Sequence, residues 1–127
     1  MNRLIIALLG SVLYSGASMA QKQTYFTNPV IHGDVADPSI LRIDDTYYAT
    51  GTSSEWAPYY PVFTSKDLVN WKQTGHVFEQ QPEWTKSSFW APEWYYHNGK
   101  VYVYYTARKK SNNTSYILSL IHISEPT

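Results

Sequence analysis

The sequence predicts an all-β protein of the β-propeller class, on the strength of two observations. The first is an internal repeat: when the sequence is aligned with itself without gaps, Pro38 falls on Pro92 and Tyr48 falls on Tyr102. The spacing from Pro38 to Pro92 is called the repeat offset below. The second is that no helical periodicity follows residues 1–20. A repeat of about 50 residues is typical of propellers, in which each repeat forms one blade of four antiparallel strands.

The first repeat contains the signals for one complete blade. Short apolar or β-branched runs alternate with residues that favour turns, which is the pattern of successive hairpins. The expected strands are residues 39–43, 47–52, 62–65 and 71–75, with turns at 44–46 and 66–70 and a loop at 53–61.

The second repeat predicts a second hairpin, with strands at 93–97 and 101–106 around Asn98-Gly99. Residues 80–88 are expected to cross between the blades, and 109–114 to form a polar loop. At the repeat offset, Tyr116 is expected to restart the strand that Val62 begins. Residues 118–127 do not follow the pattern of the repeat, which indicates a non-native or frameshifted tail. The alternative is a diverged natural strand.

Residues 1–20 have the features of a secretory signal peptide. Arg3 supplies a positive start, residues 4–13 form an apolar run too short to span a bilayer, and Ser18-Met19-Ala20 is a small-x-small cleavage site. Cleavage after Ala20 would leave residues 21–117 as the blades of a secreted or periplasmic protein.

The composition excludes several classes of partner. The formal net charge is zero at pH 7, which favours neither nucleic acid nor a membrane surface as a partner. Cysteine is absent, so the fold depends on its core rather than on disulfides. The histidines at 32, 76, 97 and 122 show no metal-ligand spacing, so no structural zinc site is expected. No cofactor is expected either, and the sequence leaves a bound calcium ion open. Twelve Tyr, five Trp and four Phe suit either sheet packing or contact with sugar rings.

Three motifs carry a resemblance to a known family. They are Asp37-Pro38-Ser39-Ile40, the run 62–71 that reads VFTSKDLVNW, and Trp90-Ala91-Pro92-Glu93. In this order they resemble the N-terminal blades of glycoside hydrolase family 43, and the resemblance extends from about Asn28 to Tyr116. It implies a five-bladed propeller of which this chain supplies about the first two blades, and therefore a truncated enzyme.

The resemblance also implies roles for individual residues. Asp37 matches the general base of an inverting glycosidase, although an Asp-Pro pair alone would only start a turn. The family's general acid, and the Asp that tunes the pKa of that acid, have no matching position here. Glu93 is expected to accept a hydrogen bond from a sugar hydroxyl or from a neighbouring strand rather than to catalyse.

Aromatic residues near the motifs are candidates for sugar binding. Trp90 and Trp56 are expected to line the pocket, with packing between blades as the alternative for both. Trp71 is expected to belong to the core. Glu55 and Asp34 match no acid of the family and are expected to be surface residues.

The resemblance implies a glycosidase for arabinosides or xylosides of plant polysaccharides, present here as an inactive fragment. One alternative is a non-catalytic carbohydrate-binding propeller, in which Asp37 and the tryptophans only hold a ligand. Another is a structural or partner-binding propeller, which the acid-proline pattern disfavours. The missing C-terminal sequence would discriminate between these alternatives, since a catalytic member must supply two further acids.

Overall fold

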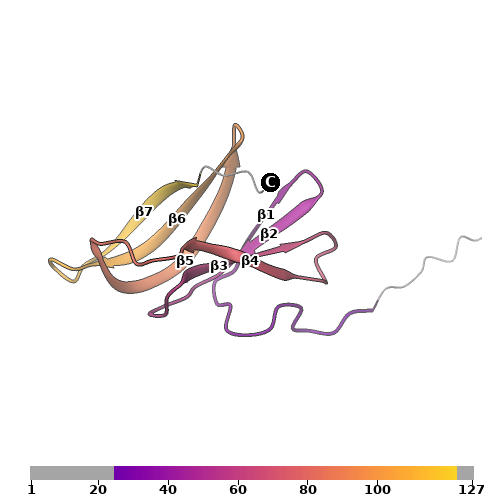
Figure 1. Ribbon diagram of the computed structural model, residues 1–127, viewed down its shortest axis with the longest axis horizontal. Helices are drawn as coiled ribbons and strands as arrows, with labels where there is room; N and C mark the ends of the chain where they lie inside the picture. Colours follow the sequence, from indigo (N-terminus) through magenta and orange to yellow (C-terminus); the bar gives the residue numbers. More distant parts are fainter. Residues whose placement is uncertain (1–24, 123–127) are drawn as a thin grey trace, which may run out of the picture.

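The computed structural model describes residues 25–122, which form two β-sheets. The strands in this part of the chain are β1 (Ser39–Ile43), β2 (Thr46–Thr50), β3 (Tyr59–Ser65), β4 (Lys72–Phe78), β5 (Thr85–His97), β6 (Lys100–Lys109) and β7 (Ser115–His122). One sheet has the order β1-β2-β3-β4 and the other β5-β6-β7, with every pair antiparallel. The two sheets lie side by side (Figure 1), as the repeat predicts. Residues 25–122 contain no helix that is long and apolar enough to cross a membrane.

The repeat offset is present in the strand register as well as in the sequence. Every residue pair between β1 and β2 recurs, at that offset, between β5 and β6. Ile40 pairs with Ala49 in the first sheet, and Trp94 pairs with Val103 in the second. The two hairpins are therefore equivalent units, which confirms the repeat.

The hairpin turns fall where the sequence predicts them. Asn98 and Gly99 both have positive φ, 50° and 73°, which is the backbone that an Asn-Gly turn between two strands requires. In the first hairpin, Asp44 has a φ of 52° and connects β1 to β2 together with Asp45.

Two strands begin earlier than the sequence predicts. Residues 80–88 are predicted to cross between blades, but β5 already begins at Thr85. The register between β5 and β6 shifts three times before Glu93, and such bulges bend a strand and break its alternation of apolar and polar residues. Similarly, β3 begins at Tyr59 rather than at Val62.

The third strand of the second sheet does not keep the repeat offset. Ala49 pairs with Phe63, but its equivalent Val103 pairs with Leu120, three positions later than the repeat predicts. The strand expected from Tyr116 is present as β7 (Ser115–His122), but Tyr116 does not occupy the register position equivalent to Val62. The cause is that β6 continues to Lys109 before the chain turns back.

The C-terminal strand includes part of the segment that the sequence marks as unusual. Residues 118–122 continue β7 and pair with β6. The origin of residues 118–127 stays a prediction, and 123–127 lie outside the described residues, as does the expected signal peptide at 1–20.

An aromatic core joins the two sheets. Its buried members are Tyr59, Tyr60, Phe89, Tyr105 and Ala107. The rings of Tyr59 and Phe89 stack with centroids 3.9 Å apart. The Tyr60 hydroxyl donates to the Thr106 carbonyl at 3.0 Å, and burial raises the pKa of Tyr60 well above its ordinary value. Because the core draws on both sheets, it fixes the junction between them.

The turn between β3 and β4 is closed by its own side chains. Asp67 Oδ1 accepts the backbone N–H groups of Val69 and Asn70 at 2.9 and 2.7 Å. Trp71, expected in the core, is only half-buried, and its indole N–H donates to the Leu68 carbonyl at 2.9 Å. Trp71 therefore closes the turn between β3 and β4 instead of joining the aromatic core.

Candidate active site

Asp37 lies two residues before β1, close to the second sheet. Its φ is 47°, a left-handed conformation that Asp adopts more readily than most residues. The side chain is exposed, and its Oδ2 atom accepts a hydrogen bond of 2.8 Å from the Thr52 hydroxyl. For the other carboxylate oxygen, residues 25–122 supply no hydrogen-bond partner, so it is accessible to solvent or to a ligand.

Thr52 connects Asp37 to the second sheet. Its Oγ1 atom accepts the backbone N–H of Ala91 at 2.8 Å, and its own N–H donates to the Ala36 carbonyl at 2.8 Å. Because Ala91 lies in β5, a single threonine links the Asp-Pro motif of the first sheet to the Trp-Ala-Pro-Glu motif of the second.

Glu93 is held by a similar arrangement that also crosses the junction. The Ser39 hydroxyl donates to Glu93 Oε1 at 3.2 Å and accepts the backbone N–H of Trp94 at 3.0 Å. Ser39 is buried whereas Glu93 is exposed. The structure therefore places both motif carboxylates, Asp37 and Glu93, at the same junction.

Trp90 lies in the same part of β5 and is 40% exposed. The guanidinium carbon of Arg108 lies 6.0 Å from the centre of its ring, within the range of a cation–π contact. The Trp90 carbonyl lies 3.3 Å from the Tyr60 hydroxyl, which anchors its backbone to the core. The ring thus has a fixed backbone and a partly free surface, as a sugar-binding aromatic requires.

The loop between β2 and β3 brings Trp56 to the junction as well. Its backbone is anchored because the N–H groups of Ser53 and Ser54 donate to the Phe89 carbonyl. Trp56 is 80% exposed, so packing between these two blades does not explain it. The sequence leaves open whether Trp56 packs or binds, and its exposure favours binding.

Glu55 has a structural partner that the sequence does not indicate. Its carboxylate accepts hydrogen bonds from the Ser88 hydroxyl at 3.1 Å and from the Ser88 N–H at 3.3 Å. Asp34, the other acid expected at the surface, is exposed. Glu55 therefore fastens the Trp56 loop to β5 instead of merely facing water.

Backbone strain is concentrated at this junction. Five non-glycine residues with positive φ surround it: Asp37, Ser54, Tyr60, Ser88 and Ala91. Such conformations cost free energy and persist only where the surrounding structure enforces them, which is common at functional sites. The strain and the hydrogen bonds coincide at one place in the fold.

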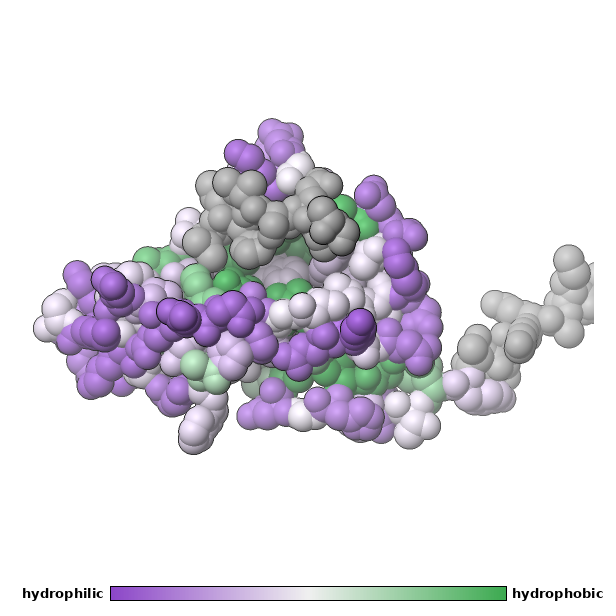
Figure 2. Space-filling model, viewed as in Figure 1, coloured by the Kyte–Doolittle hydropathy of each residue, from purple (hydrophilic) through white to green (hydrophobic). Residues whose placement is uncertain are grey.

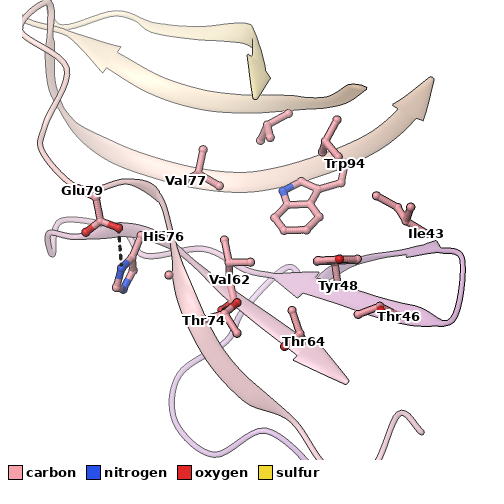
Figure 3. A pocket seen from close by; sticks show the side chains of 13 residues that line it. Ile43, Thr46, Tyr48, Val62, Thr64, Thr74, His76, Val77, Glu79 and Trp94 are labelled. Carbon is pink, nitrogen blue, oxygen red and sulfur yellow. Dashed lines mark hydrogen bonds and ion pairs between the residues drawn. The ribbon is translucent and has the colours of Figure 1, made fainter. Parts of the chain in front are cut away.

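A separate cavity of about 610 Å³ lies between the two sheets. Figure 3 shows Val62 and Thr64 of the first sheet on one side and Trp94 of the second on the other. In Figure 2 hydrophobic residues are visible between the sheets, whereas hydrophilic residues follow the outer edges.

This cavity is not the candidate active site. None of Asp37, Trp56, Trp90 and Glu93 lines it. Among residues 25–122, the one carboxylate that lines it is that of Glu79, which lies 3.7 Å from the His76 ring. Acid–base hydrolysis of a glycoside needs two carboxyl groups, and the described lining supplies one.

The junction supplies one exposed carboxylate at Asp37, a second at Glu93 and two exposed indole rings. An ionised carboxylate can accept a proton from water, and indole rings can pack on apolar surfaces of a ligand. Among residues 25–122, no three side chains of the metal-binding types gather in one place. The sequence does not indicate the roles of Thr52 and Ser39. The alignment of Thr52 with Thr106 in the internal repeat marks the position of Thr52, but not its hydrogen bonds.

The sequence is similar to a well-defined set of proteins. The family model described as glycosyl hydrolases family 43 matches residues 26–124. A non-reducing end α-L-arabinofuranosidase of Bacteroides ovatus is 39% identical over 108 residues, which cover 80% of this chain and 20% of that protein. An extracellular exo-α-(1→5)-L-arabinofuranosidase of Cellvibrio japonicus is 36% identical, covering 66% of this chain and 25% of that protein.

Solved structures agree with the sequence comparison. A Bacteroides ovatus protein of the same family superposes with a TM-score of 0.68 at 33% identity, covering 78% of this chain and 21% of the other. A xylan β-1,4-xylosidase from Bacillus halodurans superposes with a TM-score of 0.69 at 27% identity, covering 80% of this chain and 22% of the other. These neighbours are five-bladed propellers, which confirms the fold class predicted from the sequence. The chain spans about a fifth to a quarter of the length of these relatives, and it belongs to glycosyl hydrolase family 43.

Proposed function

We propose that this chain forms the first two blades of an inverting glycoside hydrolase that acts on arabinosides or xylosides, with Asp37 as its general base. The observation that carries the proposal is the Asp37 carboxylate, exposed at one oxygen and held at the other by Thr52. Similar proteins named as α-L-arabinofuranosidases and β-xylosidases support the substrate class.

In this proposal Asp37 takes a proton from a water molecule, and that water attacks the anomeric carbon of the sugar. An inverting enzyme needs a second, protonated carboxyl group about 6.5–9.5 Å away to protonate the leaving oxygen. We propose that this general acid, and the Asp that tunes its pKa, belong to blades outside this chain. Glu93 and Glu55 are not assigned to the role, because neither matches the position of the family's general acid.

Substrate binding is proposed for Trp90, Trp56 and Glu93. The exposed rings of the two tryptophans would pack on the apolar faces of sugar rings. Glu93 would accept a hydrogen bond from a sugar hydroxyl, since it is exposed and Ser39 holds its Oε1 atom in place.

Export is proposed for the same protein. The relatives from Cellvibrio japonicus and Bacillus subtilis named as extracellular support it, together with the pattern of residues 1–20. N-terminal sequencing of the secreted protein is expected to begin at Gln21, and a protein retained in the cell with Met1 intact would contradict export.

The function is tested with the complete protein that carries these blades. Purified protein would be assayed on chromogenic arabinofuranosides and xylosides, and the first sugar released would be followed by NMR. Hydrolysis with inversion of the anomeric configuration is expected. Release of the retained anomer would contradict a water-activating base, and binding without hydrolysis would favour the non-catalytic carbohydrate-binding module.

A further inference from the structure

Thr52 has the geometry of a side chain that orients a carboxylate. Only 9% of this residue is exposed, and its hydroxyl lies 2.8 Å both from Asp37 Oδ2 and from the backbone nitrogen of Ala91. A hydroxyl has one proton to donate. Because the Ala91 N–H can only donate, it occupies a lone pair of Thr52 Oγ1, and the single proton of Thr52 is left for Asp37.

The backbone of Thr52 is held against residues 35–36. Its N–H donates to the Ala36 carbonyl, so the residue is anchored next to the Asp-Pro motif. The preceding residue, Gly51, packs so closely on the same segment that a Cβ atom there would lie 2.6 Å from Val35 Cγ1. The hydroxyl that reaches Asp37 therefore comes from a rigid part of the chain.

The Ala91 N–H makes the orientation of Asp37 dependent on the second blade. Ala91 is the residue between Trp90 and Pro92, in the motif proposed to bind substrate. The pair Ser39 and Glu93 repeats this arrangement, with the Trp94 N–H as the fixed donor. At two points, then, an amide of β5 orients a hydroxyl of the first blade, and that hydroxyl donates to a carboxylate.

The repeat provides an internal comparison. At the repeat offset, Thr106 is the equivalent of Thr52, and Ala91 is the equivalent of Asp37. The second blade thus has the threonine without the carboxylate. A change at Thr106 removes a similar hydroxyl from a similar place without affecting an acid.

We infer that Thr52 is the positioning residue of the proposed general base: its hydroxyl, itself fixed by the Ala91 N–H of the second blade, holds the Asp37 carboxylate in one orientation. The inference rests on the proposed function. Reactions held in a productive geometry are fast because the reacting groups need no further ordering. Loss of the Thr52 hydroxyl would leave Asp37 present but without its donor.

The kinetic test uses the complete enzyme and the variants Thr52→Val, Thr52→Ser and Thr106→Val. Thr52→Val is expected to lower kcat by about 10- to 100-fold, the loss typical of one hydrogen bond to a charged group, with KM within about twofold. Thr52→Ser, which keeps the hydroxyl, and Thr106→Val are expected to stay within about threefold of the parent kcat. Normal kcat in Thr52→Val, or an equal loss in Thr52→Ser, would overturn the inference.

A second measurement does not depend on activity or on the folding of a variant. In the full chain, side-chain NMR couplings of Asp37 are expected to report a single χ1 rotamer. Averaged couplings in the parent chain would overturn the positioning role, whatever the enzyme does. Conversely, a single rotamer in a complete protein that hydrolyses no glycoside would retain the positioning role and refute the proposed function.

Discussion

Asp37 and Ala91 occupy the same position in two successive repeats. Each precedes a proline, and their φ angles are 47° and 45°. Only Asp37 carries a carboxylate, whereas Ala91 contributes the backbone N–H that orients Thr52. The two repeats thus have a similar backbone conformation at this position but different roles: the first provides the carboxylate, and the second helps to orient it.

The close approach at Gly51 predicts a sensitive position. Gly51→Ala is expected to destabilise the protein by about 1–3 kcal/mol, because the new Cβ atom would lie 2.6 Å from Val35 Cγ1 and 2.9 Å from the Ala36 carbonyl oxygen. Thermal or urea unfolding measures the loss. Gly75→Ala is the matched control, since nothing lies within 4 Å of its added Cβ atom. Equal stability of the two variants would contradict the packing of residues 35–36 on the end of β2.

Asp67 predicts a pH dependence of stability. Hydrogen bonds from Asn70, through its backbone and then its side chain, and from the Val69 N–H hold the pKa of Asp67 below its ordinary value of 3.8. A lowered pKa in the folded state stabilises the protein above pH 3.8, and this contribution is lost as the pH falls toward the lowered pKa.

The measurement is the melting temperature between neutral pH and about pH 3 in parent and Asp67→Ala proteins. The parent is expected to lose more stability on acidification than Asp67→Ala, because the variant lacks this carboxylate. Asp34→Ala, which removes an exposed acid elsewhere, is the control and should follow the parent. A parallel decline of parent and Asp67→Ala would show that the turn does not favour the ionised form.

Trp90 is predicted to act through binding. In the complete enzyme Trp90→Ala is expected to raise KM by about three- to tenfold, the range of one aromatic contact, with little change in kcat. Trp90→Phe, which keeps an aromatic ring, is expected to have a KM between those of the parent and Trp90→Ala. A normal KM combined with a lower melting temperature would identify Trp90 as a packing residue instead.

The isolated chain is predicted to be inactive. Residues 21–127 contain the proposed base but not the proposed acid, so the leaving group would depart without protonation. Assays of this fragment on chromogenic arabinosides and xylosides are expected to show no turnover. Turnover that Asp37→Asn abolishes would mean that the acid lies within the chain, and attention would turn to Glu93 or Glu55.

Much of the fold could be predicted because it depends on local signals. The Asn98-Gly99 turn and the alternation in β1 and β2 reflect residue preferences that act within a hairpin. The start of β5 was missed because its bulges break that alternation, and the placement of β7 was missed because β6 extends to Lys109.

The site was predictable only in part, for a similar reason. Asp37, Trp90 and Glu93 stand in recognisable motifs, so the sequence alone indicates them. The hydroxyls of Thr52 and Ser39 act on carboxylates that are distant in the sequence, and one of their donors is a backbone amide with no sequence signature. Only the docking of two blades brings these groups together.

The central claim is that Asp37 activates water in a glycosidase, and its most direct test is the turnover of Asp37→Asn in the complete enzyme. Asparagine keeps an oxygen for the Thr52 hydroxyl but cannot take a proton from water, so the fold should persist while the base is lost. We expect kcat to fall by about 10²–10⁴-fold, with a melting temperature close to that of the parent. A loss of less than about tenfold in a folded variant would remove Asp37 from the catalytic role.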